Sequence, residues 1–221
     1  MPASLIARSI SVSRGARLVL DSIDITLAPG HRVGLVGPNG VGKSTLLATL
    51  AGDLPIEVGS ITTAPPSATV GLLPQEPLRS EETVRAFLGR RTGVAGAQHE
   101  LDAATFDLAD ERSGADDRYS VALERWLSLG AADLDARIGV TWSELGLAER
   151  LLEQSTSSLS GGEAARCSLA SLLLARFDIF LLDEPTNDLD LDGLDRLESW
   201  MLGLASPLLL VSHDRSLLDR V

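Results

Sequence analysis

The sequence predicts an α/β fold in which a helical region is inserted into a core built on a parallel sheet. Two observations predict it: strand-rich ends flank a helical middle, and the later strands alternate with helices. A third observation is a glycine-rich loop that lies between a short apolar strand and a helix, at residues 37–42.

The first 73 residues predict five strands and one helix. In the second strand, apolar residues recur at nearly every other position, with a slip at Asp21 and Ser22. Pro29 and Gly30 form a turn signal before the third strand, and a helix is expected from Ser44 to Ala51. The expected strands cover residues 5–13, 17–27, 32–36, 59–63 and 68–73.

The middle of the chain, residues 81–154, is rich in Ala, Leu and charged residues and predicts helices, with helical spacing at 84–88 and 121–129. The elements expected after it are a helix at 162–176, a strand at 178–182, a helix at 191–202, a strand at 208–211 and the start of a helix at 216–221. Because the chain stops inside this last helix without a stop signal, we expect it to be truncated at its C-terminus.

The composition is that of an ordinary globular protein, with 44% hydrophobic and 23% charged residues. No apolar run approaches the ~18 residues of a membrane span, and the N-terminus lacks a secretory signal, so we expect a cytoplasmic protein without direct membrane insertion. A single cysteine, Cys167, excludes an internal disulfide framework and fits a reducing compartment. The net charge of -12 does not support contact with nucleic acid.

Large and sulfur-bearing side chains are assigned to the core. Cys167 is expected to be a small core residue on the 162–176 helix, and aromatic rings supply large buried area. The aromatic residues expected in the core are Trp126, Trp142, Trp200, Phe177 and Phe180.

The glycine-rich loop fits the phosphate-loop pattern, since four residues separate Gly37 from Gly42, Lys43 and Ser44. Glycines let backbone N–H groups point at phosphate oxygens, and the following helix adds its positive N-terminal dipole. Lys43 is the only lysine of the chain and can reach the β- and γ-phosphates, while the Ser44 hydroxyl can bind Mg²⁺. The sequence therefore predicts a nucleotide site made by Gly37, Pro38, Asn39, Gly40, Val41, Gly42, Lys43, Ser44 and Thr45.

Two adjacent carboxylates follow the apolar strand at 178–182. Ligands bind at the carboxyl ends of the strands in open α/β sheets, which is where this strand delivers Asp183 and Glu184. Asp183 is expected to hold Mg²⁺, and Glu184 is expected to orient and polarise the attacking water.

With these motifs the chain resembles the ATP-binding cassette (ABC) ATPases. Residues 159–163 (Leu-Ser-Gly-Gly-Glu) match the signature motif of that family, Gln75 matches its glutamine loop, and His213 matches its switch histidine. The resemblance implies an ABC-type P-loop ATPase fold with an N-terminal antiparallel β subdomain and an inserted helical subdomain. It implies a single nucleotide-binding domain over residues 1–221, with the helical subdomain at about 80–160.

The same resemblance implies Mg²⁺-dependent ATP hydrolysis at a composite interface between two cassettes. The implied catalytic residues are Glu184, His213 and Gln75, and the implied metal ligands are Ser44, Gln75 and Asp183. In the family the signature motif binds ATP held by a second cassette, so Ser160, Gly161 and Gly162 imply such a partner, either in the same full-length chain or in a homodimer.

The wording of the motifs is similar to that of the ABC-F subfamily, whose members carry two cassettes on one chain and act on the ribosome as translation factors or antibiotic-resistance proteins. The chain would then be the first cassette of such a protein. The alternative is the nucleotide-binding subunit of an ABC membrane transporter. A cassette that only binds nucleotide is a third interpretation, which the presence of both Glu184 and His213 disfavours.

Overall fold

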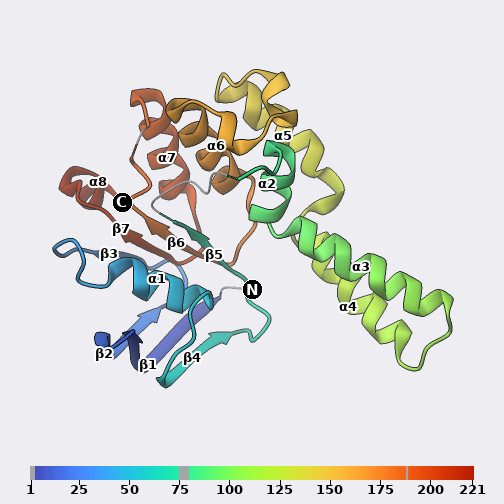
Figure 1. Cartoon of the computed structure of the whole chain (residues 1–221), viewed down its shortest axis with the longest axis horizontal. Coiled ribbons are helices and arrows are strands. Elements are labelled where there is room, and N and C mark those ends of the chain that lie inside the picture. Colours follow the sequence, from blue (N-terminus) through green and yellow to red (C-terminus); the bar gives the residue numbers. More distant parts are fainter. Residues whose placement is uncertain (1–2, 75–79, 188) are drawn as a thin grey trace. The chain divides into compact units, whose positions relative to one another are not determined.

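The computed structural model describes residues 3–74, 80–187 and 189–221. It divides into two compact units (Figure 1). The core unit consists of Met1–Pro77 and Phe177–Val221, and the helical unit consists of Leu78–Arg176.

The first sheet of the core unit has three antiparallel strands in the order β2-β1-β4. Its strands are β1 (Ser4–Arg14), β2 (Arg17–Leu27) and β4 (Val58–Ala64). The pairing of β1 with β2 shifts register near Ile10, and Ser22 has a φ of 51°. The backbone N–H of Ser22 donates to Ser11 Oγ at 3.0 Å, so a side chain replaces a ladder bond at the irregularity. The slip in the apolar alternation near Ser22 is therefore a β-bulge.

The second sheet has four parallel strands in the order β3-β7-β6-β5. Its strands are β3 (Arg32–Leu35), β5 (Val70–Leu73), β6 (Ile179–Asp183) and β7 (Leu208–Val211). All residues of β6 and β7 are buried, which is why both strands read as continuous apolar runs rather than alternating ones. The described part of the unit also contains three helices: α1 (Lys43–Ala51), α7 (Leu191–Gly203) and α8 (Arg215–Arg220).

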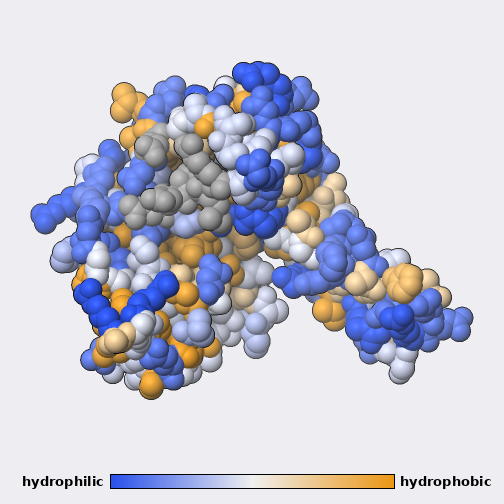
Figure 2. All heavy atoms as spheres, in the orientation of Figure 1, coloured by the Kyte–Doolittle hydropathy of each residue, from blue (hydrophilic) through white to orange (hydrophobic). Residues whose placement is uncertain are grey.

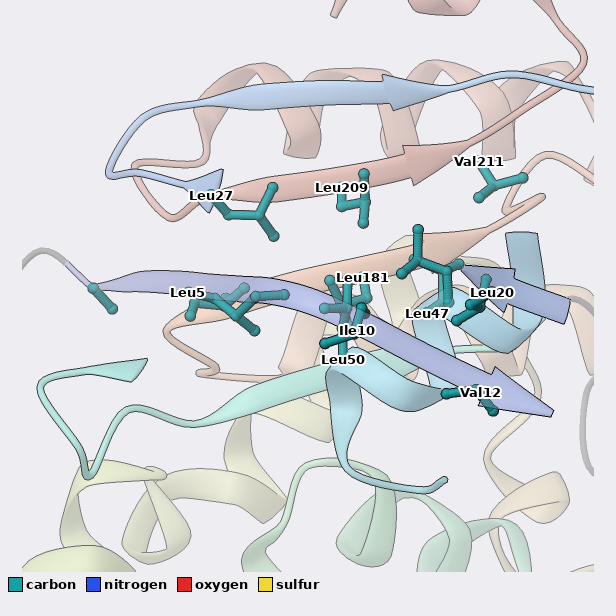
Figure 3. Packing of buried hydrophobic residues seen from close by; sticks show 14 residues of the cluster. Leu5, Ile10, Val12, Leu20, Leu27, Leu47, Leu50, Leu181, Leu209 and Val211 are labelled. Carbon is teal, nitrogen blue, oxygen red and sulfur yellow. The ribbon is translucent and has the colours of Figure 1, made fainter. Parts of the chain in front are cut away.

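An apolar cluster joins the two sheets of the core unit through helix α1 (Figure 3). Leu5 and Ile10 of β1 and Leu47 of α1 are fully buried. They lie with Leu181 of β6 and Leu209 of β7, which are also fully buried. Burying side chains of this size stabilises the fold by roughly 1.5–3 kcal/mol each. The cluster therefore holds β6 and β7 in place, together with the residues at their carboxyl ends.

The helical unit contains five α-helices and three short 3₁₀ helices among the residues that are described. The α-helices are α2 (Val84–Arg91), α3 (Val94–Ala109), α4 (Ala115–Ser128), α5 (Leu134–Glu144) and α6 (Gly161–Leu174). The 3₁₀ helices cover Ala131–Asp133, Glu149–Glu153 and Thr156–Ser158. Helix α3 packs against α4 as a two-helix hairpin, and α6 packs against α2 and α5 (Figure 1).

Charged side chains form ion pairs along the surface of the helical unit. Arg125 on α4 contacts Glu100 on α3 at 2.9 Å, and Asp133 accepts from both Arg137 and Arg176 at 2.9 Å. Figure 2 shows hydrophilic residues over much of the visible face of this unit. The Arg137 guanidinium also lowers the pKa of the Asp133 carboxyl below its ordinary value.

The predicted α/β fold, with an antiparallel sheet, a parallel sheet and helices, is confirmed, and the predicted elements begin and end within a few residues of the observed ones. The prediction of one nucleotide-binding domain over residues 1–221, with its helical subdomain at about 80–160, stays a prediction. None of the described helices is long and apolar enough to cross a membrane.

The assignment of core side chains is correct in part. Trp142 and Phe180 are buried, and burial raises the pKa of the buried Cys167 thiol to about 12. Trp126 is only half-buried, because it lies on the two-helix hairpin and donates its indole N–H to Gln98 Oε1 at 2.6 Å. Phe177 and Trp200 are also half-buried, and each ring makes an edge contact with Phe180.

Candidate nucleotide-binding site

Three neighbouring parallel strands end at one edge of the second sheet. Leu35 of β3 is in register with Val211 of β7, and Val211 is in register with Asp183 of β6. The phosphate loop follows β3, Ser212 and His213 follow β7, and Glu184 follows β6. The strand order therefore brings together residues that are far apart in the sequence.

Two glycines of the phosphate loop adopt backbone angles that other residues rarely take. Gly40 has a φ of 74° and Gly42 a φ of 110°. A Cβ atom at Gly42 would also lie 2.8 Å from Val19 Cγ1 on β2. Gly42 is the N-cap of α1, and the first amides of a helix have no acceptor within it, so the loop and helix can present N–H groups to an anion.

Lys43 lies across its own loop. Its Nζ donates to the carbonyl oxygens of Gly37 at 2.8 Å and Pro38 at 3.1 Å. Both acceptors are neutral, whereas a phosphate oxygen is charged and forms a stronger bond with an ammonium group. The ammonium is thus held at the mouth of the loop, in reach of an anion that the loop would bind.

A cavity of about 440 Å³ opens beside the loop within the core unit. Residues that the sequence places far apart line it together: the phosphate loop, the end of β6 and His213. The lining residues are Val19, Asn39, Gly40, Gly42, Lys43, Ser44, Thr45, Asp183, Glu184 and His213. Of the predicted loop residues, Gly37, Pro38 and Val41 do not line this cavity.

Glu184 has a strained backbone and a buried side chain. Its φ is 49°, a left-handed conformation that costs a non-glycine residue about 1–3 kcal/mol. Two hydrogen bonds maintain this conformation: Glu184 N donates to Val211 O at 2.9 Å, and Glu184 Oε2 accepts from His213 N at 3.2 Å. The other oxygen, Oε1, is buried and has no hydrogen-bond partner among the described residues. A carboxylate held in this way can accept a proton from a molecule that enters the cavity.

The predicted metal ligands Ser44 and Asp183 both line the cavity. Asp183 is 4% exposed, and its oxygens and the Ser44 hydroxyl are the hard donors that Mg²⁺ prefers. No group of three or more His, Cys, Asp or Glu side chains among the described residues could hold a metal by itself. A Mg²⁺ ion with few protein ligands, completed by waters and substrate phosphates, fits this donor set.

The remaining predicted site residues are Gln75 and the residues at the start of α6. Gln75 lies outside the described residues, although the strand before it, β5, ends in register with β6 at Leu73 and Leu182. Ser160, Gly161 and Gly162 belong to the helical unit, where Ser160 is the N-cap of α6.

The cap of α6 is a reciprocal pair. The hydroxyl and backbone N–H of Ser160 both donate to Glu163 Oε2, at 2.6 and 2.9 Å, and Glu163 N donates to Ser160 Oγ at 3.4 Å. The two bonds from Ser160 lower the pKa of the Glu163 carboxyl below its ordinary value. Exposed Gly161 and Gly162 have open space at their Cβ positions, so the start of this helix is accessible. An anion could approach its amides.

Val19 lines the cavity but was not predicted as a site residue. This residue is on β2, and its side chain touches the end of the phosphate loop at Gly42 only because the antiparallel sheet lies beside α1. Alternation along the strand predicts which side chains share one face of the sheet, but not which element packs against that face.

A family model described as ABC transporter matches residues 20–187 of the chain. The chain is 36% identical to the probable ATP-binding protein YheS of Escherichia coli K12, over 98% of this chain and 33% of that protein. It is 34% identical to the energy-dependent translational throttle protein EttA of Mycobacterium tuberculosis H37Rv, over 97% of this chain and 38% of that protein. It is 33% identical to ABC transporter F family member 5 of Arabidopsis thaliana, over 92% of this chain and 30% of that protein. The chain thus spans about a third of the length of these curated relatives.

The fold is also similar to that of a solved structure described as the ATP-binding subunit of an ABC transporter. The TM-score is 0.70 at 21% sequence identity, and the match covers 98% of this chain and 82% of the other. This likeness concerns the fold alone, and it agrees with the predicted ABC-type P-loop architecture. Since the family model covers most of the sequence, the chain belongs to the ABC transporter family and is an ATP-binding cassette of that family.

Proposed function

We propose that this cassette binds ATP with Mg²⁺ in the cavity of the core unit and hydrolyses it. The observation that carries the proposal is the buried carboxylate of Glu184, whose Oε1 has no hydrogen-bond partner among the described residues and which lines the same cavity as Lys43. A strained, buried acid beside an anion-binding loop is an arrangement suited to activating a water next to a phosphate.

Each side chain has a proposed role in binding. Lys43 exchanges the carbonyl oxygens of Gly37 and Pro38 for β- and γ-phosphate oxygens, and the loop amides bind the rest of the phosphate chain. Ser44 and Asp183, together with Gln75, would hold Mg²⁺, which neutralises phosphate charge when it is bound.

In the proposed reaction Glu184 Oε1 accepts a proton from a water as the water oxygen attacks the γ-phosphorus. The bond from the γ-phosphorus to the bridging oxygen breaks, and ADP leaves with that electron pair. His213 and Gln75 contact the γ-phosphate and position the water. General-base assistance of this kind contributes typically 10²- to 10⁴-fold to a rate.

We propose that the active site is completed by a second cassette. Ser160, Gly161 and Gly162 begin a helix whose exposed N-terminus can bind an anion, and in this proposal that anion is the γ-phosphate held by the partner cassette. The partner lies on the same full-length chain or in a homodimer.

For the biological role we propose the first cassette of an ABC-F protein that acts on the ribosome in the cytoplasm, in translation or in antibiotic resistance. The 34% identity to a translational throttle protein and the 33% identity to an F family member support this role. The second candidate is the nucleotide-binding subunit of a membrane transporter, which the match to the family model described as ABC transporter supports.

The binding site is tested by Lys43→Arg. Arg is a wide planar fork, whereas Lys is a compact charge on a thin stem that can enter a loop lined with glycine. We expect the substitution to weaken ATP binding at least tenfold, as measured by calorimetric titration, even though it keeps the charge. Arg8→Lys, on the exposed part of β1 outside the cavity, is the matched control and should bind ATP as the unaltered chain does. Undiminished binding by Lys43→Arg would refute the role of this residue.

The biological role is tested by co-sedimentation of the full-length Glu184→Gln protein with ribosomes in the presence of ATP. The ABC-F role predicts ATP-dependent co-sedimentation, because a cassette pair that cannot hydrolyse ATP stays closed. Co-purification with a membrane permease, without ribosome binding, would favour the transporter subunit instead.

A further inference from the structure

His213 Nε2 faces two oxygen atoms at the edge of the cavity. Asn39 Oδ1, in the phosphate loop, lies 2.9 Å from it, and Glu184 Oε1 lies 3.4 Å from it. The loop follows β3 and His213 follows β7, so this contact joins the ends of two adjacent strands.

The two oxygens favour the tautomer of His213 in which Nε2 carries the proton. An ionised carboxylate can only accept hydrogen bonds, so a nitrogen that faces Glu184 Oε1 is favoured when it carries a proton. That same N–H then donates to the side-chain carbonyl of Asn39, which fixes the orientation of the amide. The hydrogen bond goes to Asn39 at 2.9 Å, and Glu184 Oε1 remains without a hydrogen-bond partner among the residues described.

We propose that Asn39 is a positioning residue for His213: its side-chain carbonyl holds the Nε2–H of His213 and must release it before that group can donate to a γ-phosphate. The inference rests on the proposed function, in which His213 contacts the γ-phosphate. ADP has no γ-phosphate, so the hydrogen bond between Asn39 and His213 persists when ADP binds. It breaks only when ATP binds, because His213 then donates to the γ-phosphate. Asn39 therefore lowers the preference of the site for ATP over ADP.

The arrangement also keeps the proposed base free. Without Asn39, the His213 N–H would still face Glu184 Oε1, which lies 3.4 Å from Nε2. A hydrogen bond there would occupy the oxygen that accepts the proton from water. Asn39 thus directs the histidine away from the base as well as holding it over the loop.

The test is the ratio of the dissociation constants for ADP and for a non-hydrolysable ATP analogue, measured by calorimetric titration on the 221-residue chain. Both nucleotides use the same loop for the α- and β-phosphates, so damage to the loop changes both constants and cancels in the ratio. Asn39→Ala should raise the preference for the ATP analogue roughly fivefold, the equivalent of one ordinary hydrogen bond. Asn39→Asp, which keeps the shape of the side chain, should lower the preference for the ATP analogue. A carboxylate binds the His213 Nε2–H more strongly than an amide does, and it repels phosphate.

A double-mutant cycle supplies the control. In a His213→Ala background, Asn39→Ala should leave the ratio unchanged, because the partner of Asn39 is absent. ¹⁵N spectra of the histidine rings give a second readout: His213, identified by the signal lost in His213→Ala, should be the Nε2–H tautomer without nucleotide. Its signals should persist with ADP and change with the ATP analogue.

The outcomes separate the inference from the proposed function. If neither nucleotide binds, the proposed function fails. If both bind but Asn39→Ala leaves the ratio unaltered, or if His213 is the Nδ1–H tautomer without nucleotide, the role of Asn39 is refuted and the proposed function stands.

Discussion

The core unit and the helical unit hold their charged groups in opposite ways. In the core unit, Asp183 and Glu184 are buried at the end of a strand whose residues are all buried. In the helical unit, carboxylates lie at the surface and pair with arginines. Glu100 and Arg125, for example, form an ion pair in which both side chains are about half exposed. The first arrangement places charge where a ligand could use it, and the second covers helices with solvated pairs.

This difference indicates where the stability of each unit comes from. A surface ion pair contributes about 0–1 kcal/mol, whereas each fully buried Leu contributes roughly 1.5–3 kcal/mol. The packing of β6 and β7 therefore has to offset the strain at Glu184 and the burial of two carboxylates. Apolar deletions in the core unit should therefore lower the free energy of unfolding strongly, and charge deletions in the helical unit should not.

The largest stability effect is expected for Leu181→Ala. Leu181 is fully buried on β6, between Leu72 and Leu209 of the neighbouring strands. Removing its side chain leaves a cavity and should lower the free energy of unfolding by about 2–5 kcal/mol. Hydrogen exchange measured by mass spectrometry should show lost protection in β6 and β7.

Leu181→Met is the matched control for this substitution. It keeps the volume of the side chain and should cost less than about 1.5 kcal/mol. If Leu181→Ala had no more effect than Leu181→Met, the strand ends would not depend on apolar packing.

An intermediate effect is expected at the cap of α6 in the helical unit. Ser160→Ala removes the hydroxyl that caps this helix and should cost about 1 kcal/mol in thermal or urea unfolding. Ser160→Asn retains a capping oxygen and should restore most of the stability. If Ser160→Ala and Ser160→Asn were equally stable, the cap would contribute nothing.

The cap should also depend on pH. The pKa of Glu163 is lowered in the folded chain, so its carboxylate stabilises the cap fully above the unfolded pKa of about 4.3. This contribution should be lost as the pH falls through the lower, folded pKa. The stability difference between the unaltered chain and Glu163→Gln should accordingly shrink below about pH 4 and stay constant between about pH 5.5 and 7.

The smallest effect is expected for Glu100→Gln. The carboxylate oxygens of Glu100 contact Arg125 Nη1 at 2.9 Å, and both side chains are close to half exposed. The substitution should change the free energy of unfolding by about 0.5 kcal/mol or less, and 1 M salt should remove the difference. A loss comparable to that of Leu181→Ala would overturn the contrast between the two units.

Local features of the sequence predicted much of the fold and of the site. The phosphate loop is contiguous, and β6 carries its two carboxylates directly at its end, so a linear pattern contains their chemistry. The slip near Ser22 marked the bulge for the same reason.

What the sequence did not predict depends on contacts between distant segments. The left-handed backbone of Glu184 and the bond from His213 to Asn39 exist because β7 lies between β3 and β6. The apolar spacing at 121–129 predicted a helix, and α4 is there, yet its apolar residues Val121 and Leu127 are exposed. In a two-helix hairpin each helix packs against one partner, which leaves part of its apolar face uncovered. Helical spacing in the sequence does not show how much of that face its neighbours cover.

The central claim is that Glu184 activates the attacking water in a site that binds ATP. It is tested most directly by phosphate release from the full-length Glu184→Gln protein, with ATP affinity measured in parallel. Phosphate release should fall at least 100-fold while ATP binding is retained, because only the proton acceptor is lost. Glu57→Gln, at an exposed carboxylate outside the cavity, should hydrolyse ATP at the normal rate. Undiminished phosphate release by Glu184→Gln would contradict the claim.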